Sequence, residues 1–275
     1  MGLYPRLMPE TPQLFRAEVA STTRLSPSFQ RVTVIGPELD QFEWRGFDHW
    51  FRLFLPPTPT APATSSAPLI LPTVKGRAWW RSYRSIPAEQ RPHWSNYTVA
   101  DFRQLAGKAE LDIDVVLHWN QAGELGGKVA AWAVTAETGS PLALLDQGVM
   151  FDPPADTAAI RLACDATGQP AIRGILRSLD PAATGDAVVE VPTPDDIVQL
   201  EAPPGVTVEH ITPPKHDAVP GAAALTWLER AKAPGPADYA FIVGESGLAT
   251  AGRRLLRRQG LPKSRISFKG FWKHR

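Results

Sequence analysis

ELDIDVVLHW, residues 110–119, shows the strictest alternation of polar and apolar side chains in the sequence. A period of two is typical of a β-strand and gives two faces, one with Glu110, Asp112 and Asp114, the other with Leu111, Ile113 and Val115. Both faces become apolar at residues 116 and 117, so the strand is expected to start at the rim of a sheet and end inside it. The three carboxylates resemble paired general acids, but on a rim strand they are interpreted as its solvent-facing side.

Other segments of the first half also have strand character. Residues 15–27, 29–39, 49–57 and 140–148 are apolar or rich in Val and Thr, and they end at Pro or Gly. Residues 56–72 are dominated by Pro, Ala, Ser and Thr, which predicts a flexible surface loop. The turn GELGGK, residues 123–128, leads into a helix, VAAWAVTA. Residues 1–152 are therefore expected to form an antiparallel β-barrel domain with one helix.

The second half alternates strands and helices. Strands are expected at residues 158–165, 185–192, 205–211, 238–245 and 265–272, and helices at 168–179, 220–231 and 246–260. In the last helix, the apolar stripe is predicted to consist of Leu248, Ala251, Leu255 and Gln259. This order is typical of a parallel α/β sheet. FDPPAD, residues 151–156, is expected to separate the barrel from an α/β domain over residues 157–275.

Composition excludes several classes of protein. Among 275 residues, 29 Lys and Arg balance 28 Asp and Glu, so a net charge of +1 does not indicate a nucleic-acid binder. The single cysteine, Cys164, forms no internal disulfide and is expected to pack in a buried strand, and no Cys/His spacing predicts a metal site. No apolar run of membrane-spanning length and no signal-peptide pattern occurs. We therefore expect a cytoplasmic protein without a membrane span.

Two segments have the composition of a ligand site. Gly126, Gly127 and Lys128 do not form a P-loop, because Val129 stands where Ser or Thr would bind magnesium. A glycine pair that opens a helix can hold a phosphate on free backbone N–H groups, although it is also a plain helix start. The triplet Tyr97-Thr98-Val99 offers a ring, a hydroxyl and strand backbone to a planar ligand, and it is also ordinary strand sequence.

Two more features leave alternatives open. His118 follows the strand just before the glycine turn, where it either faces a ligand or is an ordinary histidine. Gly244-Glu245-Ser246-Gly247 lacks the last glycine of a nucleophile elbow, because residue 248 is leucine. This second segment combines a strand end with a helix N-terminus, and so predicts either a phosphate site or a tight turn.

Several segments, in order and over nearly the whole chain, resemble the siderophore-interacting proteins of the ferredoxin-reductase superfamily. Residues 110–118, ELDIDVVLH, are similar to that family's ELDIDFVLH, and residues 96–102, NYTVADF, to its RxYTVRRF. The other matching segments are FDHWFRLFLP (47–56), GGKVAAWA (126–133) and the ending from residue 241 to residue 275.

The resemblance implies a cytoplasmic ferric-siderophore reductase that passes electrons from NAD(P)H or ferredoxin through FAD to a ferric chelate and releases Fe(II). The flavin carries the chemistry, so no catalytic side chain and no protein-bound metal are expected. By position, Tyr97 and Thr98 would contact the isoalloxazine and ribityl chain. The flavin edge would be lined by Val115, Val116 and His118, and the diphosphate would lie on Gly127, Lys128, Val129 and Ala130.

The resemblance also places a basic mouth for an anionic iron chelate between the two domains. It would consist of Arg52, Lys269 and Lys273, with Trp272 as an apolar wall. The chain departs from the family at Ser95, Ala100 and Ala131, where the family has arginines. Loss of such a charged contact to a diphosphate costs about tenfold or more in affinity, unless Lys128 or a nearby arginine (Arg81, Arg84, Arg91 or Arg103) substitutes.

Two alternative functions follow from the same residues. One is a general NAD(P)H-flavin reductase, for which the flavin itself would be the product. The other is a non-catalytic ligand-binding protein of the same fold that has lost its flavin, which the three missing arginines favour. The sequence has no GxGxxG fingerprint that would assign the nicotinamide form.

Overall fold

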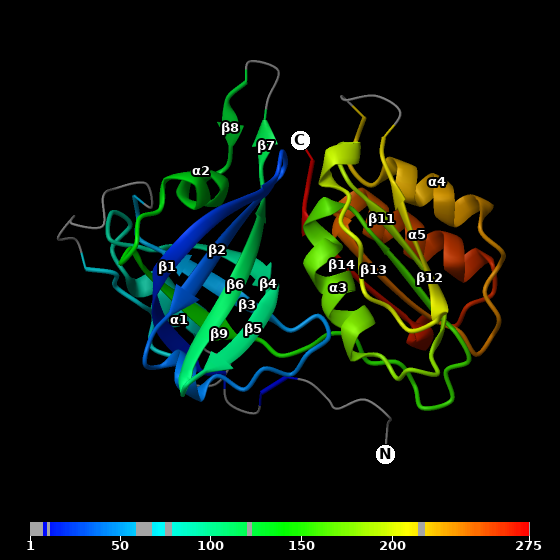
Figure 1. Ribbon diagram of the computed structural model, residues 1–275, viewed down its shortest axis with the longest axis horizontal. Helices are drawn as coiled ribbons and strands as arrows, with labels where there is room; N and C mark the ends of the chain where they lie inside the picture. Colours follow the sequence, from blue (N-terminus) through cyan, green and yellow to red (C-terminus); the bar gives the residue numbers. More distant parts are fainter. Residues whose placement is uncertain are drawn as a thin grey trace. The chain divides into compact units, whose positions relative to one another are not determined.

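The computed structural model describes residues 8–9, 12–58, 68–74, 79–119, 123–213 and 218–274. They form two compact units (Figure 1). Residues 8–45 and 49–148 are the N-terminal unit, and residues 46–48 and 149–274 are the C-terminal unit. Residues 59–67, in the middle of the loop predicted between residues 56 and 72, lie outside the described residues.

The N-terminal unit is built on a seven-stranded antiparallel sheet with the strand order β4-β3-β9-β1-β2-β6-β5. Its strands are β1 (Leu14–Ser26), β2 (Phe29–Ile35), β3 (Trp50–Leu55), β4 (His93–Thr98), β5 (Asp101–Leu105), β6 (Lys108–Val116) and β9 (Pro141–Asp146). Two short strands, β7 (His118–Trp119) and β8 (Leu125–Gly126), pair with each other. The strands expected from the sequence are confirmed.

This sheet curls back on itself. The first and last strands of this order, β4 and β5, follow each other in the chain, and only Val99 and Ala100 separate them. The Ala100 N–H donates to the carbonyl of Asp112 in β6, at 2.9 Å. The N-terminal sheet therefore forms a barrel whose interior is filled by side chains of alternating residues, among them Phe51, Leu53 and Leu55.

Two α-helices accompany the barrel in the described residues, one more than expected. The predicted helix is α2 (Lys128–Thr135) and the additional one is α1 (Trp79–Ser85), with a 3₁₀ turn at Leu39–Gln41. Trp79 of α1 is buried and packs edge-on against Phe54 and Trp94. Because α1 has only seven residues, its sequence does not show a helical period clearly.

The C-terminal unit contains a five-stranded parallel sheet with the order β12-β11-β10-β13-β14. Its strands are β10 (Ile160–Cys164), β11 (Thr184–Glu190), β12 (Gly205–Ile211), β13 (Tyr239–Glu245) and β14 (Ile266–Trp272), and its helices are α3 (Gln169–Ser178), α4 (Ala222–Arg230) and α5 (Ser246–Arg258). Separate apolar clusters cover the two faces of the sheet. An N-terminal antiparallel sheet followed by a parallel α/β sheet is thus confirmed.

The predicted stripe of α5 is only partly correct. Leu248 is buried, but the other buried residues of the helix are Ala249, Gly252 and Leu256 rather than Ala251 and Gln259. A Cβ at position 252 would lie 2.8 Å from the Cδ1 of Ile242 in β13. The helix therefore turns its glycine toward the sheet, where there is no room for a larger side chain.

Residues 46–48 interrupt the N-terminal unit and belong to the C-terminal unit. The Phe47 N–H donates to the hydroxyl of Ser178 in α3, at 2.8 Å. The buried carboxylate of Asp48 accepts from the N–H groups of Met150 and Phe151, at 3.1 and 2.9 Å. This early excursion of the chain has no local signal in the sequence.

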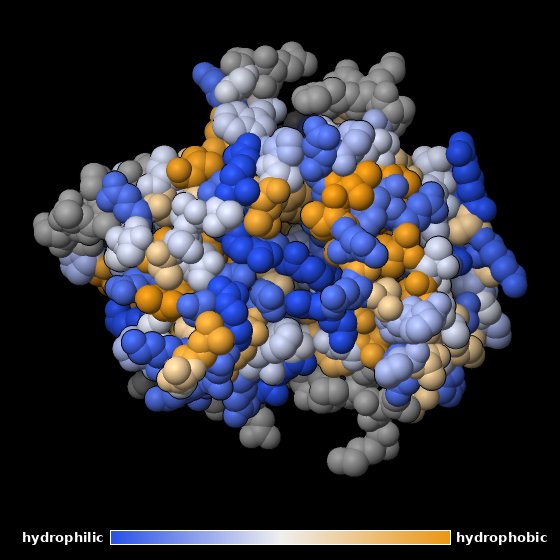
Figure 2. Space-filling model, in the orientation of Figure 1, coloured by the Kyte–Doolittle hydropathy of each residue, from blue (hydrophilic) through white to orange (hydrophobic). Residues whose placement is uncertain are grey.

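No helix in the part of the chain that the structure describes is long and apolar enough to cross a membrane. On the face of the molecule shown in Figure 2, hydrophilic and hydrophobic side chains are interspersed. This distribution agrees with the nearly balanced charge of the sequence.

Candidate functional site

The inner face of β4 carries the first part of the candidate site. In the antiparallel pairing of β3 with β4, Tyr97 lies opposite Phe51 and His93 lies opposite Leu55. Phe51 and Leu55 belong to the barrel core, and residues directly opposite share a face. Because side chains alternate along a strand, His93, Ser95 and Tyr97 lie on this core side of β4.

Tyr97 connects three of the predicted segments. Its partly buried ring packs against the apolar cluster that contains Val99, Val115, Val129 and Ala130. Burial raises the pKa of the Tyr97 phenol, so the phenol is neutral at physiological pH. Tyr97, Val115 and the start of α2 therefore contribute to the same barrel core.

Two of the residues predicted to contact the flavin have side chains on the opposite face of their strand. Thr98 is buried opposite Trp50, on the face of β4 opposite to Tyr97. Val116 follows Val115 and therefore lies on the opposite face of β6. A ligand beside Tyr97 would meet the backbone of Thr98 rather than its hydroxyl.

The N-terminus of α2 carries the second part of the site. Gly127 is the N-cap residue, with a left-handed φ of 91°, and no side chain in the described part of the chain caps the helix. His118 is exposed and pairs with Gly126 across the two short strands next to this turn (Figure 1). The first N–H groups of α2, with the exposed Lys128, form a donor set of the kind that binds phosphate.

The two parts of the site lie on one apolar core, because Leu55, opposite His93, clusters with Val129 and Ala130 of α2. Burial and the nearby Lys128 ammonium together lower the pKa of His93 below its ordinary value. The start of β4 and the start of α2 therefore share one electrostatic environment. An elongated ligand could place a ring system at Tyr97 and an anionic group between His93 and Lys128.

Several arginines proposed as substitutes for the missing ones have other partners. The Arg91 guanidinium donates to the carbonyls of Ile86 and Arg84. The Arg103 guanidinium is held by the carboxylates of Glu110 and Asp112. Neither can turn to a diphosphate without losing these contacts, whereas Lys128 lies at the helix start itself.

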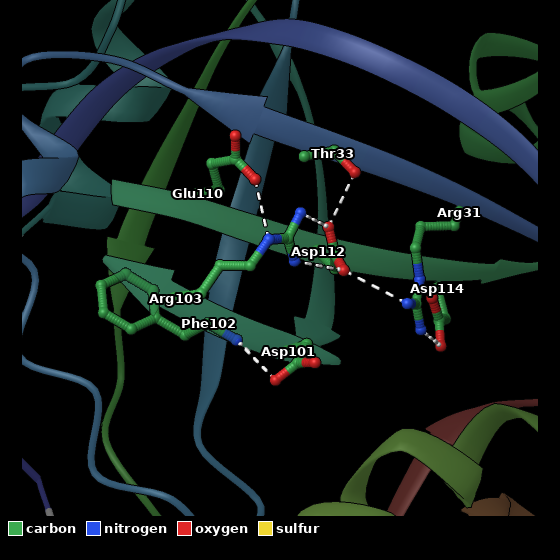
Figure 3. A network of polar contacts seen from close by, with 8 residues as sticks. All are labelled: Arg31, Thr33, Asp101, Phe102, Arg103, Glu110, Asp112 and Asp114. Carbon is green, nitrogen blue, oxygen red and sulfur yellow. Dashed lines mark hydrogen bonds and ion pairs between the residues drawn. The ribbon is translucent and has the colours of Figure 1, made fainter. Parts of the chain in front are cut away.

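The acidic face of β6 is not solvent-facing, and that prediction was wrong. Asp112 and Asp114 are buried, and a polar network extends across β2, β6 and β5 (Figure 3). The Thr33 hydroxyl donates to Asp112 at 2.7 Å, and Arg31 and Arg103 lie 3.2 and 2.8 Å from the same carboxylate. Basic residues on both neighbouring strands neutralise the carboxylates, which makes their burial possible.

The C-terminal unit presents a different kind of helix start. The Glu245 carboxylate caps α5 by accepting from the N–H groups of Gly247 and Leu248. The Asp165 carboxylate accepts from the Glu245 N–H at 2.7 Å and from the Trp272 indole at 2.9 Å. A buried carboxylate already occupies the place of an anion here, which favours the tight turn over the phosphate site.

A third buried carboxylate repeats this arrangement. Glu190, at the end of β11, accepts from the N–H groups of Gly221 and Ala224 at the start of α4, at 2.7 and 2.9 Å. Burial raises the pKa of Glu190, against the effect of these backbone donors. Cys164, which is buried at the end of β10, lies in the core of the sheet.

The residues of the predicted basic mouth are divided between the two units. Arg52 is half-buried in the N-terminal unit, where its guanidinium lies 5.0 to 5.4 Å from the ring centres of Trp50, Trp79 and Trp94 and donates to Asn96 at 3.0 Å. In the C-terminal unit, exposed Lys269 lies in the middle of β14, half-exposed Trp272 is the last residue of that strand, and exposed Lys273 follows it. The mouth itself stays a prediction.

Comparison with known proteins supports one family over both units. Residues 18–150 match the family model of the siderophore-interacting FAD-binding domain, and residues 157–275 match that of the siderophore-interacting protein. The chain is 28% identical over 278 residues to the ferric vibriobactin reductase ViuB of Vibrio cholerae, a match that covers 98% of this chain and 90% of ViuB.

Two further similarities agree. The NADPH-dependent ferric-chelate reductase of Escherichia coli is 30% identical over 182 residues, or 66% of this chain. The matched region spans 63% of the length of that relative. The crystal structure of a siderophore utilization protein from T. fusca is 26% identical, with a TM-score of 0.76, over 97% of this chain and 95% of that one. With both units matched in order along the sequence, the chain belongs to the siderophore-interacting protein family.

Proposed function

We propose that the protein is an FAD-dependent ferric-siderophore reductase of the cytoplasm. It takes electrons from NAD(P)H or ferredoxin and passes them to a ferric chelate, which then releases Fe(II). The match to an FAD-binding domain and the printed names of the V. cholerae and E. coli relatives support this proposal.

The observation that carries the proposal is the pairing of the Tyr97 face with the uncapped start of α2. An aromatic ring on an apolar cluster suits an isoalloxazine, and backbone N–H groups beside Lys128 suit a diphosphate. FAD has these two chemistries at its two parts, so the residues present fit it. When bound, FAD supplies the electron transfer.

In this proposal, the protein's own residues bind the FAD and orient it. The Tyr97 ring would lie against the flavin, the Thr98 backbone and Val99 would border it, and Val115 would back the ring from the core. His118 is proposed at the outer flavin edge, where Val116, whose side chain points away from that of Val115, would contribute its backbone. Gly127 has no side chain and leaves the first amides of α2 open to the diphosphate, together with Lys128, Val129 and Ala130.

The substrate side is proposed at the basic residues Arg52, Lys269 and Lys273, with Trp272. Chelates of ferric iron by catecholates and hydroxamates are commonly anionic, so cations raise their local concentration. Three tryptophan rings fix the direction of the Arg52 guanidinium, which reduces the entropy lost on binding. Lys273 follows the carboxyl end of a parallel strand, the edge at which open α/β sheets bind ligands, and Lys269 lies earlier on the same strand.

The test begins with the purified protein. Flavin absorbance together with FAD in the mass spectrum of released small molecules is expected, as is anaerobic reduction of a ferric siderophore, read by a colorimetric Fe(II) trap. One Fe(III) accepts one electron, so one NAD(P)H supports two reductions. A colourless protein that cannot be reconstituted with FAD, yet binds the chelate, would instead support the non-catalytic binding protein.

The electron donor is tested in stopped flow. Rapid bleaching of the bound flavin by NADPH or NADH alone assigns a nicotinamide donor, and bleaching only by reduced ferredoxin assigns ferredoxin. A general flavin reductase would reduce excess free flavin faster than any ferric chelate. In that case the ferric-siderophore assignment is incorrect.

A further inference from the structure

His93 lies in line with the residues proposed to hold the flavin. It is the first residue of β4, two positions before Ser95 and four before Tyr97, so all three lie on the core side of the strand. The side chain is partly buried. A ligand that covers Tyr97 and extends along β4 toward α2 would therefore pass Ser95 and then His93.

The start of α2 packs on the same barrel core, because Val129 and Ala130 belong to the apolar cluster that contains Leu55, the residue opposite His93. The Lys128 ammonium acts on His93 through space and, with burial, lowers its pKa. With its pKa lowered, His93 is a neutral imidazole at physiological pH and can donate one N–H, while Lys128 supplies the positive charge.

His93 shares the core side of β4 with Ser95, one of the positions at which the chain lacks an arginine of the family. Ser95 stands on this face in place of an arginine, Ala100 is fully buried, and Ala131 lies in α2. The structure engages Arg91 and Arg103 elsewhere. His93, on the core side of β4, and Lys128, the first residue of α2, are therefore the candidates for contact with the expected diphosphate.

We propose that His93 and Lys128 together hold the diphosphate of FAD, in the role that arginines have in other members of the family. An imidazole N–H and an ammonium both donate hydrogen bonds to phosphate oxygens, and such bonds are strengthened by charge. The inference rests on the proposed function, because it requires FAD along β4. His93 and Lys128 are thus positioning residues for the cofactor.

The experiment compares two flavins that differ in the diphosphate. Apoprotein is titrated with FAD and with riboflavin, which has the same ring system but no phosphate, and binding is followed by calorimetry or by quenching of flavin fluorescence. His93→Ala and Lys128→Ala are each expected to raise the Kd for FAD about tenfold. The Kd for riboflavin should stay within about twofold of the parent value, which also shows that the site has folded.

Further variants separate charge from shape. His93→Gln retains a polar side chain and guards against misfolding, and it should weaken FAD binding while leaving riboflavin binding intact. Adding Ser95→Arg to His93→Ala restores the family's cation and should return the Kd for FAD to near the parent value. The matched control is His210→Ala in β12, another partly buried histidine whose pKa is lowered by burial, and it should change neither Kd.

The outcomes distinguish this inference from the proposed function. If the parent binds FAD and His93→Ala binds it equally well, the diphosphate assignment is wrong while the flavin site stands. Equal weakening of FAD and riboflavin also overturns the inference, because it indicates a structural role for His93. If the parent apoprotein binds no FAD, the proposed function fails, and the inference fails with it.

Discussion

Arg31 and Asp114 lie directly opposite each other on β2 and β6, and the guanidinium donates to both carboxylate oxygens, at 2.8 and 3.0 Å. The Asp114 carboxylate is 2% exposed, so its charge depends on this partner. Burial works against the charge of Arg31, but Asp114 and Asp112 raise its pKa above the ordinary value. The pair connects two strands that are distant in sequence and helps to fix the register of β2 against β6.

Removal of one partner should therefore destabilise the N-terminal unit. Arg31→Ala leaves the Asp114 carboxylate buried without its cation, and we expect a loss of about 3 kcal/mol in unfolding free energy. The double variant Arg31→Met with Asp114→Leu should lose less than the sum of the single changes. Urea denaturation followed by tryptophan fluorescence measures both values.

A surface pair gives the control for this comparison. Glu43→Ala breaks an ion pair with Arg45 in which the Glu43 side chain is 82% exposed, and a change below about 0.5 kcal/mol is expected. If Arg31→Ala is as mild as Glu43→Ala, the buried pair does not stabilise the fold.

Asp48 predicts a pH dependence of stability. Burial raises its pKa from 3.8 to about 6, although the N–H groups of Phe151 and Met150 oppose this rise. A carboxyl group whose pKa is higher in the folded state binds its proton more tightly there, so its contribution to stability is greatest below about pH 4 and declines until about pH 6. The difference of about two pKa units corresponds to about 3 kcal/mol.

Asp48→Asn should remove this decline. The Asn oxygen can still accept the Phe151 N–H, so at about pH 4 the variant and the parent should have similar stability, whereas at about pH 7 the variant should be more stable by up to about 3 kcal/mol. Urea denaturation at several pH values between these limits measures the difference. Asp195→Asn, at an exposed position, is the control and should show no such trend. The same difference between Asp48→Asn and the parent at every pH would contradict this prediction.

Most elements were predictable from the sequence because most strands and helices carry their own period, whereas β5 and the short pair of β7 and β8 were not predicted. The burial of Asp112 was not, since a period of two tells which residues share a face but not what lies opposite. Its partner Arg31 is on β2, and Arg103 approaches from β5. Contacts formed between strands far apart in the chain have no local signal.

The candidate site shows the same limit. Tyr97 and Gly127 carry local motifs, and the structure brings their surroundings together in one apolar cluster with Val129 and Ala130. His93 precedes the motif and was missed, although the period of two from Tyr97 through Ser95 includes it. Only the folded chain shows that α2 and β4 contribute to the same core.

Flavin retention tests the role of the Tyr97 ring. Tyr97→Phe keeps an aromatic face, so the flavin content of the purified protein should be close to that of the parent. Tyr97→Ala removes the ring and should weaken flavin binding about tenfold or more. Absorbance at the flavin bands measures the content, and thermal unfolding of the apoprotein separates a lost contact from a lost fold. Equal losses in the two variants would show that the ring does not pack against flavin.

The lysines of β14 test the proposed substrate surface. Lys269→Glu and Lys273→Glu reverse the charge in the middle of the strand and just beyond its carboxyl end, so each should raise the KM for an anionic ferric siderophore. The effect should be larger at low ionic strength than at about 0.5 M salt, because salt screens charges on an exposed surface. Flavin content should not change.

The matched control for the charge reversal is Lys263→Glu, an exposed lysine in the turn before the same strand. It alters the net charge of the protein by the same amount but lies at the amino end of β14, away from the edge at which α/β sheets bind ligands. Its KM should therefore stay near the parent value. If all three variants raise KM equally, the chelate responds to overall charge and the proposed surface is wrong. An increase restricted to positions 269 and 273 would localise binding of the anion to the stretch from the middle of β14 to just beyond its carboxyl end.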